Sequence, residues 1–218
     1  MTVMQKPPGR LQSAGPRGVA RPKVSLQNLH HLAYLTQDTE ATADFYSRIL
    51  GLPLVNAVLD DHVPSTKAPL PYFHSFFRLA TGETIAFFEC PGSAPPPPKT
   101  DPAQRDFEHL ALEVPTRADV DAWREWLSAN GLSVISNDHG IIYSIYFRDP
   151  VNDIRLEITT TIDREWNAQE ESARTALDEW ASTKQTARAS GKDVTEALRE
   201  FAAAYSHSAR LKSTKPDA

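Results

Sequence analysis

Two matched stretches decide the fold of this chain: Leu29-His30-His31-Leu32-Ala33, and Phe107-Glu108-His109-Leu110-Ala111-Leu112. Each opens a segment that begins on a strand histidine and ends on a strand carboxylate. The first segment closes at Ala86-Phe87-Phe88-Glu89, and the second at Asp149-Pro150 and Arg155-Leu156-Glu157. Two such segments in tandem predict a duplicated module that holds one metal ion between its halves, and therefore an enzyme whose reaction uses the metal.

The first segment predicts a strand, a helix and three further strands. The helix is indicated by apolar residues at every fourth position, which line one helical face: Ala41, Phe45 and Ile49. Thr36 or Asp38 is its expected N-cap, because a short polar side chain can accept a hydrogen bond from the first helical turn. Gly51 is expected to end the helix.

The first hairpin predicts which side chains are neighbours. Strands are expected over 72–79 and 84–89. If Thr81-Gly82 forms a two-residue turn between them, His74 lies directly across from Glu89 on one face of the sheet. Both side chains then either line the pocket or face solvent.

The second segment repeats the order of the first. A strand is expected over 109–114 and a helix over 117–130, which Gly131 ends. Three further strands are expected over 133–136, 141–147 and 154–161. The residues Asp149-Pro150-Val151-Asn152-Asp153 form the turn between the last two. Each segment therefore predicts a β-α-β-β-β module, and the fold class is α+β.

Composition divides the chain into five parts. Residues 1–26, rich in proline and arginine without apolar periodicity, predict a disordered N-terminal arm. The two βαβββ modules span 27–92 and 106–161, and a proline-rich linker at 93–105 separates them. Residues 162–218 predict a C-terminal helical extension, because apolar stripes recur there at helical spacing.

Charge and cysteine content narrow the function classes. The 218 residues carry a formal net charge of −5, which favours neither a nucleic acid nor a membrane as partner. The single cysteine, Cys90, excludes an internal disulfide and fits a reducing cytoplasm. The sequence contains no run of about 18 apolar residues that would predict a membrane span. It also has no apolar N-terminal stretch that would predict a signal peptide. We therefore expect a cytoplasmic protein with a small-molecule substrate.

Strand parity brings the candidate metal ligands to one side of the modules. Side chains alternate between the two faces of a strand. The apolar members of each strand suit the face that packs against the helix, which leaves the other face to His31, His109 and Glu157. His30 competes with His31, but parity places it on the helix side.

The chain resembles the vicinal oxygen chelate superfamily over roughly residues 28–161. This superfamily includes glyoxalase I, extradiol ring-cleaving dioxygenases, fosfomycin-resistance enzymes and bleomycin-binding proteins. The matching pieces are His31-Leu32-Ala33-Tyr34, Asp44-Phe45-Tyr46, Leu50-Gly51-Leu52, Phe107-Glu108-His109-Leu110-Ala111, Tyr146-Phe147-Arg148-Asp149-Pro150 and Leu156-Glu157.

The resemblance implies two modules whose sheets form a cup around a divalent metal, with His31, His109 and Glu157 as ligands. Two imidazoles and one carboxylate suit Fe(II) best, with Mn(II), Zn(II) and Ni(II) as alternatives. The substrate is expected to chelate through two adjacent oxygens. Members of the family close the cup within one chain or across a dimer, and we expect a homodimer.

The resemblance leaves three activities open. In an extradiol dioxygenase, Tyr146 matches the tyrosine that hydrogen-bonds the substrate oxygen, and His74 is a candidate acid–base residue. In a glyoxalase I-like lyase or isomerase, Glu89 matches a fourth ligand that doubles as the base. A metal-free resistance protein of the bleomycin-binding kind needs no ligands, and the complete ligand set argues against it. We expect an Fe(II) extradiol-type dioxygenase for a catechol-like aromatic.

Other residues compete for these roles or have none. Tyr143 lies close to Tyr146 in the sequence and is a competitor for the same role. His62 and His139 lie in loop-like stretches, where an exposed, solvated side chain is the default expectation.

Overall fold

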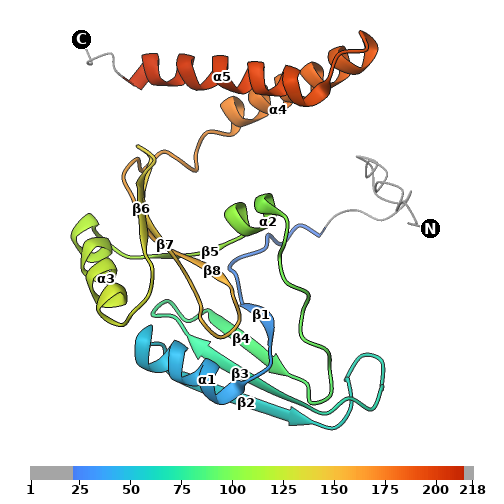
Figure 1. Ribbon diagram of the computed structural model, residues 1–218, viewed down its shortest axis with the longest axis vertical. Helices are drawn as coiled ribbons and strands as arrows, with labels where there is room; N and C mark the ends of the chain where they lie inside the picture. The colour runs from blue at the N-terminus through green and yellow to red at the C-terminus, as the bar shows by residue number, and fades with distance from the viewer. Residues whose placement is uncertain (1–21, 214–218) are drawn as a thin grey trace. The chain divides into compact units, whose positions relative to one another are not determined.

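The computed structural model describes the backbone of residues 22–213 and the side chains of residues 22–205 (Figure 1). Most of the predicted N-terminal arm lies outside this range. The chain forms two compact units. The first holds the described residues up to Arg105 together with Asp149–Ile154, and the second holds Asp106–Arg148 and the chain from Arg155 onward.

The first unit is built on a four-stranded mixed sheet in the order β1-β4-β3-β2, in which only the β1–β4 pair is parallel. Its strands are β1 (His31–Thr36), β2 (Leu54–Asp60), β3 (Tyr72–Arg78) and β4 (Thr84–Glu89). Helix α1 (Thr39–Asp44) continues into the π-helical turn η1 (Phe45–Ile49), and both follow β1 in the chain (Figure 1). This is the predicted βαβββ order.

The cap of α1 is the predicted one. The side chain of Asp38 accepts a hydrogen bond of 2.8 Å from the backbone N–H of Ala41. Thr36, the alternative cap, instead lies 2.8 Å from the hydroxyl of Thr42. Gly51 follows η1 with φ of +72°, a conformation that glycine adopts without strain, and it ends the helix as expected.

The β3–β4 hairpin has a longer loop than the sequence suggested. The backbone N–H of Leu79 donates to the carbonyl of Glu83 at 2.8 Å, so three residues, 80–82, form the loop. Gly82 takes φ of +109° at its last position, as such loops require. The predicted two-residue turn at Thr81-Gly82 is therefore wrong by one residue.

That one residue shifts the register of the whole hairpin. His74 pairs with Phe88, whereas Glu89 pairs with Phe73. Because a shift of one position moves a side chain to the other face, His74 and Glu89 lie on opposite faces of the sheet. The predicted direct pairing of His74 with Glu89 is wrong.

The second unit repeats the topology with the strand order β5-β8-β7-β6. Its strands are β5 (Leu110–Glu113), β6 (Ile135–Asp138), β7 (Ile142–Arg148) and β8 (Arg155–Thr161). Helix α3 (Arg117–Ala129) contacts β7 and β8 and is held at its start by a capping box between Thr116 and Asp119. The short helix α2 (Pro102–Phe107) occupies the end of the predicted linker.

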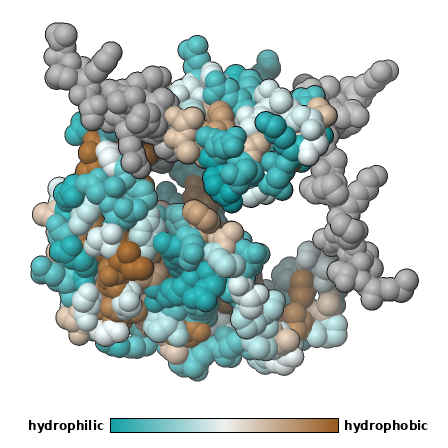
Figure 2. Space-filling view, turned by 45° about the horizontal axis from the view of Figure 1, so that its top comes forward, coloured by the Kyte–Doolittle hydropathy of each residue, from teal (hydrophilic) through white to brown (hydrophobic). Residues whose placement is uncertain are grey.

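The predicted C-terminal helical extension is present as α4 (Glu170–Ala189) and α5 (Val194–Ser213), which pack together with the rings of Trp180 and Phe201 6.0 Å apart. Leu177 on α4 is 65% exposed. On the face that Figure 2 shows, hydrophobic residues form separate patches among hydrophilic ones.

None of the helices between residues 22 and 213 combines the length and apolar character of a bilayer span. The homodimer stays a prediction.

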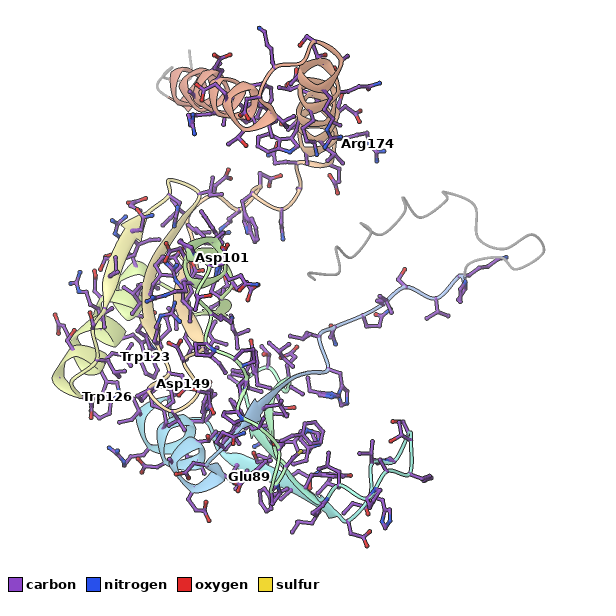
Figure 3. The ribbon with its side chains drawn as sticks, turned by 45° about the vertical axis from the view of Figure 1, so that its right-hand side comes forward. Glu89, Asp101, Trp123, Trp126, Asp149 and Arg174 are labelled. Carbon is purple, nitrogen blue, oxygen red and sulfur yellow. The ribbon has the colours of Figure 1, made fainter. Side chains whose placement is uncertain are left out.

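A buried carboxylate organises the segment Asp149–Ile154 within the first unit. Asp149 is 1% exposed and its Oδ1 accepts hydrogen bonds from the N–H groups of Val151 and Asn152, at 2.7 and 3.1 Å. The buried hydroxyl of Tyr46 donates to Oδ2 at 3.2 Å, and Figure 3 shows Asp149 beside α1. Burial and the Asp149 charge both raise the pKa of Tyr46.

Replacing Asp149 with Ala is expected to lower the free energy of unfolding by about 3 kcal/mol, because the Tyr46 hydroxyl and two backbone donors lose their acceptor. Tyr46→Phe, which removes one donor, should lower it by about 1 kcal/mol. Urea denaturation followed by circular dichroism measures both. The exposed Asp178→Ala on α4 is the matched control and should leave stability unchanged. Wild-type stability in the Asp149 variant would contradict this account.

Candidate active site

Two of the predicted ligands meet in the second unit. His109 directly precedes β5, and its Nε2 lies 2.9 Å from Oε2 of Glu157 on β8. Glu157 is 2% exposed, so its carboxylate is almost completely withdrawn from water. A buried carboxylate needs a partner of positive charge or several hydrogen bonds.

The second ring nitrogen of His109 determines its tautomer. Nδ1 lies 2.7 Å from the carbonyl oxygen of Phe107, and a carbonyl only accepts, so Nδ1 carries a proton. In the neutral ring Nε2 then presents its lone pair to Glu157. Two acceptors that face each other at 2.9 Å require a cation, either a proton or a metal ion. A backbone carbonyl that orients the imidazole in this way is typical of metal-ligating histidines, so this donor set fits a divalent metal.

Tyr146 extends the same cluster. It is the direct cross-strand neighbour of Glu157, and its hydroxyl donates to Oε1 of Glu157 at 3.1 Å. The guanidinium of Arg155 lies 4.6 Å from the centre of its ring. Burial, followed by the negative charge of Glu157, raises the pKa of Tyr146. The phenol is therefore a hydrogen-bond donor held beside two potential metal ligands.

Tyr143 does not share this position. Its hydroxyl donates to Oδ1 of Asp121 at 2.9 Å, and the guanidinium of Arg117 covers its ring at 3.9 Å. Tyr143 thus joins β7 to α3, on the face opposite the one that holds Glu157. Of the two tyrosines, only Tyr146 contacts a candidate ligand among the described residues.

His139 is a site residue that the sequence analysis missed. It lies just after β6, and its Nε2 is 3.0 Å from the hydroxyl of Tyr146. The side chain is exposed, as expected, but it also contacts Asn137. The register of β6 on β7 pairs Ile135 with Tyr146 and Asn137 with Ser144, so His139, two residues after Asn137, lies on the same face as Tyr146 and reaches its hydroxyl along the sheet. No local motif near His139 announces that pairing.

His31 belongs to the first unit and lies on the face of its sheet that turns away from α1. The hydroxyl of Thr36, at the end of the same strand, bonds Thr42 of α1, so alternate residues of β1 point the other way. We call this second surface the open face. The strand register extends the open face from β1 across β4 to β3. It includes the side chains of His31, Ala33, His74, Phe76, Arg78, Thr84, Ala86 and Phe88.

His74 is the polar residue at the centre of the open face. It is 9% exposed, stacks on Phe88 with ring centres 3.5 Å apart, and lies 6.4 Å from the ring of His31. Its Nε2 is buried without a hydrogen-bond partner among the described residues. Burial, and secondly the proximity of His31, lower the pKa of His74. A neutral imidazole with an unsatisfied nitrogen is suited to bind a polar ligand atom.

Glu89 lies on the other face of the sheet. Its Oε2 accepts a hydrogen bond of 2.9 Å from the backbone N–H of Thr39, the first residue of α1, and Figure 3 shows Glu89 beside this helix. A carboxylate at a helix N-terminus accepts a hydrogen bond from a free backbone N–H, and its negative charge interacts favourably with the positive end of the helix dipole. This contact gives Glu89 a structural explanation and places it away from His31.

A second group of potential ligands is exposed. Asp60, the last residue of β2, and Asp61 and His62, which follow it, place their ligand atoms within 4.8 Å of one another. His62 pairs with Asp61 at 2.7 Å, so the cluster has an internal partner. Exposed acidic clusters of this kind are common in proteins without an ion, and we assign it no role.

A family model of the Glyoxalase/Bleomycin resistance protein/Dioxygenase superfamily matches residues 28–158, and the chain belongs to this superfamily. The match covers both βαβββ modules and confirms the resemblance to the vicinal oxygen chelate proteins. The C-terminal helices lie outside it.

Individual relatives are distant. The chain is 29% identical over 105 residues to the Bacillus subtilis (strain 168) protein named "Putative ring-cleaving dioxygenase MhqA"; this match covers 47% of the chain and 30% of that protein. A domain of the superfamily from Frankia sp. EAN1pec shares the fold with a TM-score of 0.51 and 21% identity, covering 63% of this chain and 99% of that one. Fosfomycin resistance protein FosX of Listeria monocytogenes, complexed with Mn(II) and sulfate, aligns with a TM-score of 0.46 and 19% identity, over 65% and 98% of the two chains.

The position of Glu89 leads to a test that separates a structural role from a ligand role. Glu89→Ala should lower the free energy of unfolding by about 1 kcal/mol, because the backbone N–H of Thr39 at the start of α1 loses its acceptor, and should leave the bound-metal stoichiometry unchanged. Denaturation and elemental analysis measure the two quantities. Glu40→Ala, in the first turn of the same helix, is the control for a change of charge. Loss of metal in the Glu89 variant alone would restore Glu89 as a ligand.

Proposed function

We propose that this chain is a metal-dependent, extradiol-type dioxygenase that opens the ring of a catechol-like aromatic with dioxygen. The observation that carries the proposal is the His109–Glu157 pair. Its two acceptor atoms converge at 2.9 Å, with the imidazole tautomer determined by Phe107 and a tyrosine donor attached to the carboxylate. Such an arrangement combines a cation site with a hydrogen-bond donor for a substrate oxygen.

His31, His109 and Glu157 would hold the metal, with Fe(II) favoured over Mn(II), Zn(II) or Ni(II) by two imidazoles and one carboxylate. When bound, the ion supplies Lewis-acid stabilisation of two adjacent substrate oxygens and, as Fe(II), access to dioxygen chemistry. The protein's own contribution is to hold the Glu157 carboxylate in a buried site and to orient His109 through Phe107.

Tyr146 is proposed to donate its hydroxyl proton in a hydrogen bond to a substrate oxygen. Its raised pKa keeps the phenol protonated at neutral pH, so it acts as a donor and not as a base. His139 lies 3.0 Å from the same hydroxyl and is suited to hold it in place when the bond to Glu157 is exchanged for one to substrate.

His74 is proposed as the acid–base residue. Its lowered pKa keeps the imidazole neutral, so that it can accept the proton of a substrate hydroxyl. Phe76 and Phe88, with ring centres 4.1 and 3.5 Å from that of His74, surround it with aromatic surface. Such surface favours a planar aromatic substrate over a small aliphatic one.

Two observations favour ring cleavage over a glyoxalase I-like reaction. Glu89, which that reaction would use as ligand and base, bonds the N-terminus of α1 on the face opposite His31. The name of the Bacillus subtilis relative also describes a ring-cleaving dioxygenase, and it supports the same class for this chain. Both observations favour the dioxygenase over the glyoxalase I-like lyase.

The metal proposal predicts one divalent ion per chain. His109→Ala and Glu157→Gln should each weaken Fe(II) binding by about 100-fold or more, because each removes one of three ligands. Anaerobic titration with Fe(II) and elemental analysis measure this. His62→Ala, in the exposed acidic cluster, is the control and should bind like wild type. Undiminished metal binding in both ligand variants would sink the proposal.

The two neighbouring tyrosines allow a matched comparison of activity. Tyr146→Phe should lower kcat/KM for catechol cleavage by about 10- to 100-fold, because it removes a positioned hydrogen-bond donor. Tyr143→Phe removes an equivalent hydroxyl from the same strand and should leave kcat/KM within about twofold, since that hydroxyl bonds Asp121. Oxygen uptake and the absorbance of the ring-opened product are the readouts. Equal losses in the two variants would assign Tyr146 a purely structural role.

A further inference from the structure

We propose that the open face of the first unit also carries a subsite for a carboxylate substituent of the substrate, with Arg78 as the residue that binds it. This inference rests on the proposed function, because the carboxylate is carried by the aromatic ring that the enzyme would cleave. The subsite is built entirely from residues of the first unit.

The strand register places Arg78 in the same row as His31. His31 of β1 pairs with Thr84 of β4, and Thr84 pairs in turn with Arg78 of β3. Since neighbouring strands lie about 4.8 Å apart, the backbones of His31 and Arg78 are about 10 Å apart. Both side chains stand on the open face, one on each side of Thr84.

The side chain between His31 and Arg78 is small. Thr84 stands between the two residues, and Ala33 and Ala86 occupy the next row along the strands. Large side chains, Phe76 and Phe88, stand on β3 and further along β4. Ala86 is fully buried, and the ring centres of His31 and Phe76 lie 6.1 Å apart, so the space for a flat ring is over the partly exposed Thr84, with one edge toward His31 and the other toward Arg78.

A pocket opens at the Arg78 end of this row. It has a volume of about 650 Å³, and Arg78, Phe76, Thr84 and Asn56 are among its lining residues. Asn56 lies on β2 across from Phe76, so its amide belongs to the same face. The pocket thus combines one arginine, the carboxylate of Glu83, neutral polar groups and an aromatic side chain.

The guanidinium of Arg78 has no carboxylate partner among the described residues. By contrast Arg48, elsewhere in this unit, makes two bonds of 2.8 Å to Asp44. Glu83 also lines the pocket, and the hydrogen bond from the Thr81 side chain lowers the pKa of Glu83 and keeps it charged, but its carboxylate bonds Thr81 and not Arg78. An unpaired guanidinium beside an aromatic wall matches the planar, two-oxygen geometry of a carboxylate.

The inference is tested by calorimetric titration of the full-length protein, both metal-free and loaded with redox-silent Zn(II). The probes are 3,4-dihydroxyphenylacetate and its methyl ester, which differ in charge but little in shape. The wild type should bind the acid about tenfold more tightly than the ester, because a charge-assisted hydrogen bond is gained at a partly exposed site.

The arginine variants assign the preference to one side chain. Arg78→Met should abolish the preference for the acid, and Arg78→Lys, which keeps the charge but not the two-pronged donor, should retain part of it. Arg48→Met is the matched control and should behave as wild type. Equal affinity for acid and ester, a preference that survives in Arg78→Met, or no binding of the acid to either form overturns the subsite.

The outcome is separable from that of the proposed function. If Arg78 controls a preference for the acid but no catechol is cleaved with Fe(II) and dioxygen, the dioxygenase proposal fails and the subsite stands. If catechols are cleaved without any preference for the acid, the subsite fails alone.

Discussion

The alternation of side chains along the strands is the constraint on which both halves of the candidate site depend. Each residue of a strand belongs either to the face that meets the helix or to the opposite face, and the register passes that assignment to the next strand. His31, His74 and Arg78 share the open face through this rule. Glu89 is excluded from it because the loop ending at Gly82 has three residues and not two.

The candidate site is marked by buried polar groups: a carboxylate that faces a histidine lone pair, and a histidine nitrogen without a partner among the described residues. Glu157 is buried, and it faces a histidine whose lone pair Phe107 directs toward it. His74 is buried with one nitrogen unsatisfied. Buried polar groups are otherwise nearly always paired, and such exceptions carry a cost in stability. Their presence on the surfaces that carry the candidate ligands is the physical reason to regard these surfaces as functional.

The two modules share a topology but differ in what they contribute. The second carries the candidate ligands His109, just before β5, and Glu157 on β8, with Tyr146 on β7, on a sheet whose other face packs on α3. The first carries one candidate ligand, the proposed acid–base residue His74, and the row from His31 through Thr84 to Arg78.

Much of this arrangement could be predicted from local patterns. Helical spacing, the Asp38 cap and the Gly51 stop depend on residues a few positions apart, so the sequence by itself determined the order of elements and the faces of the candidate ligands. The pairing of His74 with Phe88, and the contact of His139 with Tyr146, depend on hydrogen bonds between strands. Only the tertiary structure decided these, because one extra loop residue, invisible to periodicity, moves the partner of His74 from Glu89 to Phe88, and the register of β6 on β7 puts His139 on the face of Tyr146.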